Sequence, residues 1–316
     1  MKDERASTRV ALLGLGAMGL PMATWLAQHF EVDVYDPDPS RIELAAKAGV
    51  HPADTAAAAC RHADVAVISV RTADQMQHVL FGAGEVQGIA QALRPGAAVV
   101  MTSTVGADAV RHAAEELRPF SIGLVDAPVS GGSVRAASGD LLVMVGASRE
   151  HLEVTRPVLD LLGSTVYVVG SEPGDGQTMK TVNQLLCGVH TAAAAEALAL
   201  AHSLGLDLER CLQILQSGAA ASFMLADRGP RMIAQLRSEP VELRSRTDVM
   251  AKDMGIVQGL CQTSGVLSPV AEAAYGKFRA AVRAGMAEQD DSSITIMQAP
   301  ITTPTGGPSP DDATPT

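Results

Sequence analysis

Three glycines separate an apolar run from a stretch with helical spacing near the start of the chain, within VALLGLGAMGLPMATWLAQHF. Gly14 permits a tight turn directly after a strand expected at 10–14. Gly19 lets the following helix, expected within 17–28, pack closely against that strand. A strand that turns at once into a helix is typical of an α/β fold.

The alternation of strand-like and helical segments continues as far as Gly170. Apolar runs that predict strands lie at 10–14, 31–36, 64–70, 97–102, 123–128, 141–146 and 165–170. Helical spacing between the first four, for example at 40–48, predicts a parallel sheet covered on both faces. After Gly170 the strand-like runs stop, and helices are expected over 175–203, 207–217, 222–236, 247–264 and 268–285.

These patterns divide the 316 residues into four segments, and the length fits two domains. Residues 1–8 are expected to be a flexible lead-in, 9–172 an α/β domain and 173–298 an all-helical domain. The segment 299–316 is rich in Pro, Thr, Gly and Asp, which predicts disorder.

The composition argues against several kinds of partner. A formal net charge of −11 disfavours nucleic acid or an anionic membrane, since either attracts a basic surface. The cysteines form no C-x-x-C pair, and no His/Asp cluster suggests a metal site. The N-terminus lacks the apolar core of a signal peptide, and no uninterrupted apolar run is long enough to span a bilayer. We therefore expect a cytoplasmic, reduced protein that requires no metal.

Gly14, Gly16 and Gly19 have the G-x-G-x-x-G spacing of a dinucleotide-binding turn, in the required strand–turn–helix context. Gly16 lets the backbone approach a pyrophosphate, which would lie at the helix N-terminus. Asp36 ends the second strand, where a carboxylate accepts ribose hydroxyls and repels a 2′-phosphate. This favours NAD over NADP, although Arg41 lies close enough to complicate the choice. The alternative is a glycine turn in an α/β protein that binds no dinucleotide.

A second glycine-containing turn follows the strand expected at 123–128, in DAPVSGGSVRAASGDLLVMVG. Pro128 interrupts the ladder. Ser130, Gly131 and Gly132 then offer a hydroxyl and two unobstructed backbone N–H groups, which suit a carboxylate. A tight surface loop explains this segment alone equally well.

The long helical pattern GDGQTMKTVNQLLCGVHTAAAAEALALA, residues 174–201, carries an amine in an almost uncharged sequence. A buried lysine is costly unless it has a function. Lys180 and Asn183 are three residues apart and share a helix face, which Cys187 and His190 continue. Considered alone, the pattern also fits a lysine that extends from an amphipathic helix into solvent.

Four segments occur together in one order: GLGAMGLPMA, DAPVSGG with GDLLVMVG after it, GDGQTMKTVNQ, and KDMGIV at 252–257. Through them, residues 9 to about 297 resemble the β-hydroxyacid dehydrogenase family, which includes 3-hydroxyisobutyrate dehydrogenases, tartronate semialdehyde reductases and L-threonate dehydrogenases. The resemblance implies an N-terminal Rossmann domain, a long interdomain helix, an all-α C-terminal domain, an active site in the cleft between the domains, and a homodimer or homotetramer.

The resemblance also implies a role for each motif by position. Lys180 is the expected catalytic residue, and Lys252 a lysine near the cofactor, unless Lys252 and Asp253 form only a solvated helix pair. The expected substrate contacts are Ser130, Gly131, Gly132, Asn183 and His190, although a hydrogen bond within a helix interface explains His190 as well. The expected NAD contacts are Gly14, Leu15, Gly16, Ala17, Met18, Gly19, Asp36, Val70, Thr104 and Lys252.

Oxidation of a hydroxy acid needs a group that takes the hydroxyl proton while the cofactor supplies the redox chemistry. A free lysine, with a pKa of about 10.4, is too strongly protonated to act as a base at neutral pH. Partial burial and the positive nicotinamide ring are expected to lower the pKa of Lys180, whereas the substrate carboxylate opposes that shift.

The segments NQLLCGVHTAAAAEA and VLFGAGE, at 79–85, look most like the L-threonate dehydrogenase branch. A four-carbon sugar acid such as L-threonate is therefore the first expected substrate, with 3-hydroxyisobutyrate or tartronate semialdehyde as alternatives. A catalytically silent NAD-binding interaction module is an alternative of another class. Lys180 argues against that module and against related imine reductases, which usually carry another residue there. SVRTADQ replaces a Leu-Pro pair frequent in the family after the strand at 64–70, so adenosine contacts there stay open.

Overall fold

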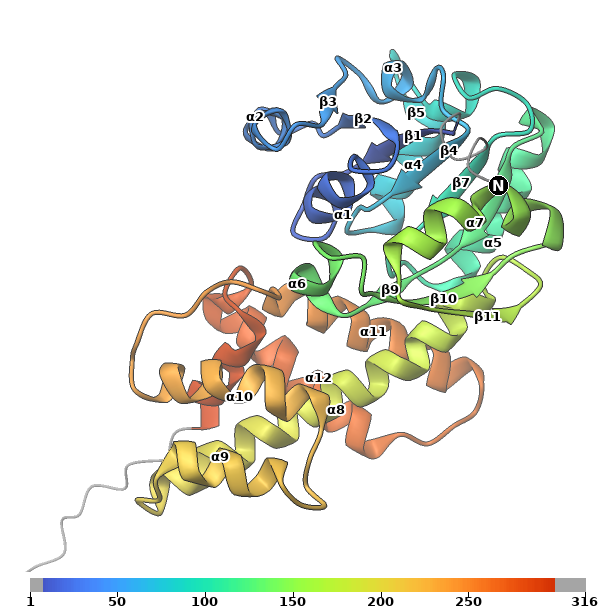
Figure 1. The fold of residues 1–316 in the computed structure, drawn as a ribbon. Coiled ribbons are helices and arrows are strands. Elements are labelled where there is room, and N and C mark those ends of the chain that lie inside the picture. The colour runs from blue at the N-terminus through green and yellow to red at the C-terminus, as the bar shows by residue number, and fades with distance from the viewer. Residues whose placement is uncertain (1–7, 299–316) are drawn as a thin grey trace, which may run out of the picture. The chain divides into compact units, whose positions relative to one another are not determined.

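The computed structural model describes residues 8–298, and Figure 1 shows their order along the chain. The strands are β1 (Arg9–Leu13), β2 (Glu31–Tyr35), β3 (His51–Pro52), β4 (Val65–Ile68), β5 (Gly82–Ala83), β6 (Val86–Gln87), β7 (Ala98–Met101), β8 (Gly123–Asp126), β9 (Val129–Ser130), β10 (Leu142–Gly146) and β11 (Thr165–Gly170). The α-helices are α1 (Gly19–Leu26), α2 (Pro39–Lys47), α3 (Ala56–Cys60), α4 (Ala73–Phe81), α5 (Ala107–Leu117), α6 (Gly132–Ala136), α7 (Arg149–Leu162), α8 (Asp175–Ser203), α9 (Leu208–Gln216), α10 (Phe223–Leu236), α11 (Thr247–Thr263) and α12 (Pro269–Ala281). The 3₁₀ helices η2 (Ile89–Gln91), η3 (Arg118–Phe120) and η5 (Asp291–Gln298) and the π-helical turn η4 (Val282–Met286) complete the set.

The predicted fold class, an α/β part followed by an all-α part, is confirmed. Each strand expected from the sequence is present, and the helix expected at 175–203 has those bounds. The expected lead-in and disordered tail lie outside the described residues, except for Thr8.

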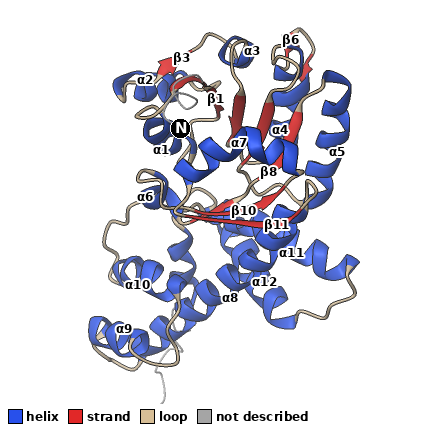
Figure 2. Cartoon of the chain, turned by 45° about the vertical axis from the view of Figure 1, so that its right-hand side comes forward, coloured by secondary structure: helices blue, strands red, loops and turns tan. Residues whose placement is uncertain are grey.

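The parallel part of the sheet has the order β3-β2-β1-β4-β7-β8. Val10 of β1 lies opposite Val32 of β2 on one side and Val65 of β4 on the other. The strand order reverses between β1 and β4, and α/β sheets bind ligands at the carboxyl ends of the strands at such a point. The glycine turn at 14–19 follows β1 at this edge (Figure 2).

Strand β10 departs from the expected parallel sheet. Its Gly146 pairs antiparallel with Asp126 of β8, and β11 pairs parallel with β10, so both run opposite to the other strands. The connection from β8 to β10 contains only the two-residue β9 and the five-residue α6. Without a long crossover helix the chain returns directly, and the next strand is antiparallel. The 14-residue helix α7 then crosses over to place β11 parallel to β10.

Two apolar cores cover the two faces of the sheet. On one face Leu12 packs with Met22 and Leu26 of α1 and with Leu159 of α7. Alternate residues of the same strands face the other way, where Leu13 belongs with residues of α3, α4 and α5. This alternation is the expected result of side chains that point to opposite faces at successive strand positions.

Helix α8 approaches α11 closely at Gly188. A Cβ there would lie 2.2 Å from Sδ of Met254, so a larger residue would require the Met254 side chain to move. By length and composition alone α8 could cross a membrane, yet Gln177, Lys180 and Gln184 are among its buried side chains. These buried polar groups have partners within the protein, because Gln177 donates to Asp126 and Gln184 donates to Asp253.

The described chain divides into two compact units. One contains the residues up to Val189 together with Leu243–Asp290, and the other contains His190–Glu242 with the segment from Asp291 onward. Helix α8 therefore begins in the first unit and ends in the second.

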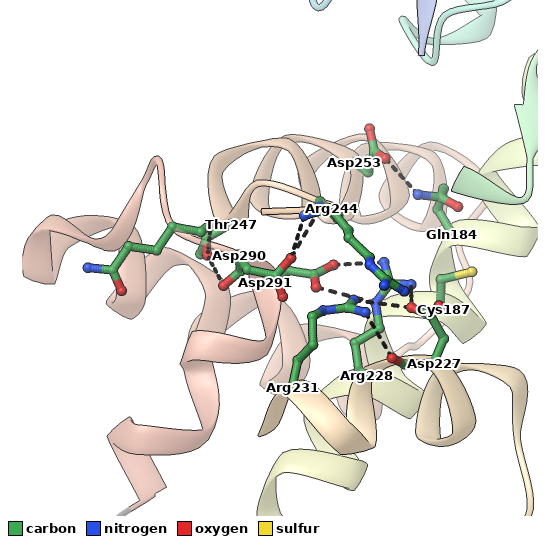
Figure 3. A network of polar contacts seen from close by, with 12 residues as sticks. Gln184, Cys187, Asp227, Arg228, Arg231, Arg244, Thr247, Asp253, Asp290 and Asp291 are labelled. Atoms are coloured by element: carbon green, nitrogen blue, oxygen red, sulfur yellow. Dashed lines mark hydrogen bonds and ion pairs between the residues drawn. The ribbon is translucent and has the colours of Figure 1, made fainter. Parts of the chain in front are cut away.

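A buried ion-pair cluster holds the second unit together. Arg228 of α10 donates from Nη2 to Oδ2 of Asp291 in η5 at 2.9 Å, and from Nη1 to Oδ2 of Asp227 at 2.7 Å. Arg231 shares that Asp227 oxygen at 3.1 Å (Figure 3). The side chain of Asp291 is fully buried, and Arg228 supplies the opposite charge that a buried carboxylate requires.

Candidate active site

The glycine turn is shaped by the packing of the protein itself. Gly14 has a φ of +94°, and a Cβ there would lie 2.2 Å from the Ser69 carbonyl oxygen. A Cβ on Gly19 would lie 1.8 Å from the Gly14 carbonyl oxygen. A Cβ on Gly16, by contrast, would meet no atom within 4 Å. Gly14 and Gly19 are thus explained by the fold, whereas Gly16 leaves open space that a bound group can use.

The remaining positions of the turn differ in exposure. Leu15 is buried, Ala17 is exposed, and Met18 packs against the core on the α1 face of the sheet. The backbone N–H of Leu15 donates to Oδ2 of Asp36 at 2.6 Å. Oδ1 of Asp36 accepts from the N–H of Asp38 at 2.9 Å. The carboxylate of Asp36 is therefore fixed beside the turn, and each oxygen keeps acceptor capacity for a ribose hydroxyl.

The loops after β4 and β7 are tied together at the same edge of the sheet. The N–H of Val70 donates to Oγ of Ser103 at 2.8 Å. Lys252 of α11 donates from Nζ to the carbonyl oxygen of Thr104. Val70, Thr104 and Lys252, which the sequence predicts as cofactor contacts, are all half-buried.

The Ser130–Gly131–Gly132 turn joins β9 to α6. Ser130 lies in β9 and pairs with Leu142 of β10. Gly131 has a φ of +143° and Gly132 a φ of +75°, conformations that favour glycine. A turn of this kind can aim backbone N–H groups at an anion. No protein atom lies within 4 Å of the Cβ position of Gly132.

Lys180 is buried, with 5% of its surface exposed, and its Nζ lies 3.4 Å from Oδ1 of Asn183. Burial lowers its pKa from the ordinary lysine value. The negative charge of Asp253 and the thiol of Cys187 oppose that shift, and the positive charge of Lys252 adds to it. The interpretation of Lys180 as a lysine extended into solvent is therefore wrong, because the amine lies inside the protein.

Asp253 links the two lysine-bearing helices. Its Oδ2 accepts from Nε2 of Gln184 in α8 at 2.6 Å, as Figure 3 shows, and its Oδ1 lies 3.0 Å from Nζ of Lys252. Asp253 is only 5% exposed, so the alternative of a solvated Lys252–Asp253 pair is wrong. While Lys180 is protonated, the two lysines and this one carboxylate carry a net positive charge, which suits an anionic substrate.

His190 lies on the same helical face as Lys180 but ten residues further along the sequence. At 1.5 Å per residue that is about 15 Å along the helix axis, longer than a four-carbon acid. It also begins the other compact unit. Cys187, one turn beyond Asn183, is nearer, and its Sγ lies 3.9 Å from Oδ1 of Asn183.

Sequence reasoning assigned no role to three buried polar residues of this region, Asp126, Gln177 and Gln184, although Gln184 replaces the second asparagine of a pair common in the family. Gln177 and Gln184 lie within the motif GDGQTMKTVNQ, three residues before and four after Lys180. Their helical spacing to the lysine was the available signal. Asp126 ends an apolar strand and has no partner nearby in the sequence, which indicates a buried carboxylate bound by residues from elsewhere in the chain. Among residues 8–298 no group of three or more His, Cys, Asp or Glu side chains is arranged to hold a metal ion.

Two family models match the chain. The NAD binding domain of 6-phosphogluconate dehydrogenase matches residues 9–170, and the NAD-binding domain of NADP-dependent 3-hydroxyisobutyrate dehydrogenase matches residues 174–297. A curated L-threonate dehydrogenase of Escherichia coli O6:H1 is 35% identical over 93% of this chain and 96% of its own length. The chain belongs to the β-hydroxyacid dehydrogenase family.

Other members are similar over nearly the whole chain. The NAD-dependent L-serine dehydrogenase of Pseudomonas aeruginosa is 32% identical over 90% of this chain and 96% of its own. The crystal structure of a 3-hydroxyisobutyrate dehydrogenase from Salmonella typhimurium superposes with a TM-score of 0.84 at 33% identity, covering 92% of this chain and 99% of that one. This family member is accordingly an NAD-dependent dehydrogenase that acts on the CH–OH group of a hydroxy acid.

The residues present fit NAD. The space next to Gly16 accepts a group that approaches the backbone, and the Asp36 carboxylate is fixed beside it by Leu15. This arrangement suits a pyrophosphate near the start of α1 and an adenosine ribose at the end of β2.

Proposed function

We propose that this enzyme oxidises a four-carbon sugar acid, with L-threonate as the first candidate, and that Lys180 is its acid/base. The observation that carries the proposal is an amine buried on α8 whose pKa is lowered mainly by that burial. A lowered pKa makes a larger fraction of the amine neutral at a given pH than in a solvated lysine, and the neutral amine is the form that can accept a proton.

In this mechanism Lys180 accepts the proton of the substrate hydroxyl as the carbon–hydrogen bond breaks. NAD, when bound, supplies the acceptor for the hydride and its electron pair. Asn183, whose Oδ1 faces Nζ of Lys180, orients the amine and holds the substrate oxygen. The turn of Ser130, Gly131 and Gly132 holds the substrate carboxylate through its hydroxyl and N–H groups. In the reverse direction Lys180 returns the proton to the carbonyl oxygen.

We propose cofactor contacts along the carboxyl edge of the sheet. The turn at 14–19, including Leu15, Ala17 and Met18, would hold the pyrophosphate, and Asp36 the adenosine ribose. Val70 would contact the adenosine half, and Thr104 and Lys252 the nicotinamide half. The hydrogen bonds from Val70 to Ser103 and from Lys252 to Thr104 support this grouping, because they tie the loops to one another.

The substrate proposal rests on relatives of similar length. L-threonate dehydrogenases from several bacteria are 33–35% identical to this chain, and the L-serine dehydrogenase is 32% identical. 3-Hydroxyisobutyrate and tartronate semialdehyde are the second candidates. Cys187 and His190 offer polar groups further along the α8 face for a longer acid, although the axial separation makes His190 a remote contact.

A panel of hydroxy acids tests this assignment through the absorbance of NADH. It contains L-threonate, D-threonate, 3-hydroxyisobutyrate, L-serine and glycerate. We expect the highest kcat/KM for L-threonate, by about tenfold or more over the three-carbon acids, because polar contacts discriminate strongly between hydroxyl patterns. If kcat/KM is higher for 3-hydroxyisobutyrate, that acid replaces L-threonate as the assigned substrate. If no acid is turned over although NAD binds, the mechanism is rejected.

Asp36→Asn is expected to reduce the preference for NAD over NADP. The amide oxygen can still accept the Leu15 N–H, but the charge that repels a 2′-phosphate is gone. The ratio of kcat/KM for NAD to that for NADP should fall about tenfold, or about 1.4 kcal/mol. Asp38→Asn, at the exposed cap of α2, is the control and should leave the ratio unchanged. An unchanged ratio in Asp36→Asn would place cofactor choice elsewhere.

The acid limb of the pH–kcat profile for oxidation should respond to the charges around Lys180. Asp253 raises the pKa of Lys180, so Asp253→Asn should move the limb to lower pH. Lys252 lowers that pKa, so Lys252→Met should move the limb to higher pH. Steady-state rates at saturating NAD measure both, with Asp248→Asn on the same helix as the control. Shifts of both variants in one direction would contradict this electrostatic account.

We further propose that residues 9–172 bind the dinucleotide and that 173–298 complete the substrate site, which the boundaries of the two family models support. A cytoplasmic location and a homodimer or homotetramer are part of the same proposal. The free thiols of Cys60, Cys211 and Cys261 fit a reducing compartment. Exposed apolar side chains such as Val182, Leu186 and Leu200 on α8 fit an oligomer interface.

A further inference from the structure

Gln177 uses the full hydrogen-bonding capacity of its amide. It is completely buried in the first turn of α8, three residues before Lys180. Its Oε1 accepts from the N–H groups of Val105 at 2.9 Å and Gly106 at 3.0 Å. Its Nε2 donates to the carbonyl oxygen of Ser103 and to Oδ1 of Asp126, each at 2.9 Å. A side-chain amide has two donors and two acceptor sites, so every one of them is engaged.

Asp126 fixes the beginning of the same helix from the end of β8. Its Oδ2 accepts from the N–H of Gly174 at 2.9 Å and from the N–H of Gln177 at 2.8 Å, across 48 and 51 positions of sequence. Burial raises the pKa of Asp126 to about 6, and the hydrogen bonds from Gln177 and Gly174 oppose this rise. The carboxylate is therefore mostly ionised at neutral pH. A negative charge at a helix N-terminus stabilises that helix.

The first turn of α8 packs closely against the sheet. A Cβ on Gly176 would lie 2.6 Å from the Met144 carbonyl oxygen and 2.9 Å from that of Asp126. The helix therefore touches the backbone of β10 and the end of β8 directly. The position of Lys180, one turn later, follows from these contacts.

Both ends of the Gln177 amide hold the loop Ser103–Gly106. This loop includes Thr104, the proposed contact of the nicotinamide half, and Lys252 and Val70 bind it from two other directions. Gln177 is the side chain of α8 that joins this loop to the Lys180 helix through three of its four hydrogen bonds. Lys180 itself donates to Asn183 rather than to this loop.

We propose that Gln177, held by Asp126, is a positioning residue that sets the distance between the Lys180 amine and the nicotinamide-contacting loop Ser103–Gly106. This rests on the proposed role of Lys180. The proton leaves the hydroxyl oxygen and the hydride leaves the carbon bonded to that oxygen. The base and the hydride acceptor must therefore be spaced correctly. A displacement of about 1 Å far from the reacting atoms can cost about 100-fold in rate.

Gln177→Met tests the proposal, because methionine has similar length and volume but neither donor nor acceptor. We expect kcat to fall about 10- to 100-fold, with KM for the hydroxy acid and the dissociation constant of NAD within about threefold of the wild type. The primary deuterium isotope effect on kcat, measured with substrate deuterated at the reacting carbon, should rise as hydride transfer becomes slower than product release. A purely structural role would reduce the folded fraction and leave the isotope effect of the remainder unchanged.

Two further variants complete the test. Thr181→Val, the matched control, removes a buried hydroxyl of the same helix that bonds only to the Gln177 carbonyl oxygen, and kcat should stay within about twofold of the wild type. Gln177→Asn keeps the amide one methylene shorter and should give an intermediate kcat, which serves if Gln177→Met does not fold. NAD titration reports the folded, binding-competent fraction of each variant.

The outcomes separate this proposal from the one on which it rests. A Gln177→Met or Gln177→Asn enzyme with wild-type kcat and isotope effect per NAD-binding site overturns the positioning role. Lys180→Met is measured beside them. If it keeps wild-type turnover, the mechanism itself fails. If it is inactive while both Gln177 variants are normal, only the positioning role fails.

Discussion

Lys180→Met is expected to abolish most turnover while the protein folds and binds NAD. General acid–base catalysis contributes about 10²- to 10⁴-fold, so kcat for hydroxy-acid oxidation should fall by that factor. The dissociation constant of NAD should stay near the wild-type value, because the glycine turn and Asp36 are untouched. Steady-state kinetics and a direct NAD titration measure the two quantities separately.

The same substitution is expected to stabilise the fold. Burial lowers the pKa of Lys180 in the native state, so the unfolded chain binds more protons wherever the pH lies between the native and unfolded pKa values. The buried charged amine therefore reduces the unfolding free energy of the wild type most at low pH. This loss disappears as the pH rises through the native pKa toward about 10.5. The gain in unfolding free energy of Lys180→Met over the wild type should accordingly be largest at low pH.

Lys180→Arg is the companion variant. A guanidinium keeps the positive charge but does not lose its proton at accessible pH, so it should be as inactive as methionine. Arginine also places a larger, permanently charged group in a buried site, so the Lys180→Arg protein should be less stable than the Lys180→Met protein. An active Lys180→Arg enzyme would show that the charge, rather than proton exchange, is what the reaction needs.

The sequence predicted those parts of the molecule that depend on local pattern. The run VALLG followed by Gly14, Gly16 and Gly19 predicted a strand, a turn and a helix, and the structure has β1 and α1 in that place. The helix over 175–203 was predicted with its observed bounds, because a long segment rich in Ala and Leu has strong helical propensity.

The direction of β10 could not be read from its residues. LLVMVG is an apolar run that fits a parallel or an antiparallel strand equally well. Its direction depends on whether the preceding connection forms a crossover helix, and α6 proved to be only five residues long. The contrast with α7 shows that the length of the connection, rather than the strand, decided the pairing.

The polar connections of the candidate site were hidden for a related reason. The partners of Gln177 are 51 to 74 positions away in the sequence, and the Gln184–Asp253 bond spans 69. A glutamine in a helical pattern carries no sign of such partners. Lys180 was identified because its motif and the other three match the family in order, although the helix alone also fitted a lysine extended into solvent. A buried amide, by contrast, becomes informative only when its four hydrogen bonds are known.

A pair of alanine substitutions in the glycine turn is expected to separate the fold from cofactor binding. Gly16→Ala adds a methyl group where no protein atom lies within 4 Å, so the stability should stay within about 0.5 kcal/mol of the wild type. The same methyl group would occupy the space that a pyrophosphate needs. The dissociation constant of NAD should rise about 100-fold, which corresponds to about 2.7 kcal/mol.

Gly19→Ala should have the opposite pattern, because its Cβ would lie 1.8 Å from the Gly14 carbonyl oxygen. Alanine is normally the better helix former, by about 1 kcal/mol over glycine. Here the clash forces the start of α1 away from the turn, and we expect the unfolding free energy to fall by about 3 kcal/mol. Gly259→Ala in α11 meets no atom within 4 Å and is the control, which should be neutral or slightly stabilising.

Thermal or urea unfolding together with NAD titration distinguishes the two variants. If Gly16→Ala binds NAD as tightly as the wild type, the pyrophosphate does not approach Gly16, and the motif serves only the packing of α1. If Gly19→Ala is as stable as Gly259→Ala, the close contact between Gly19 and Gly14 is relieved without cost. The G-x-G-x-x-G spacing therefore contains two requirements that act through different glycines, one on the free energy of folding and the other on that of cofactor binding.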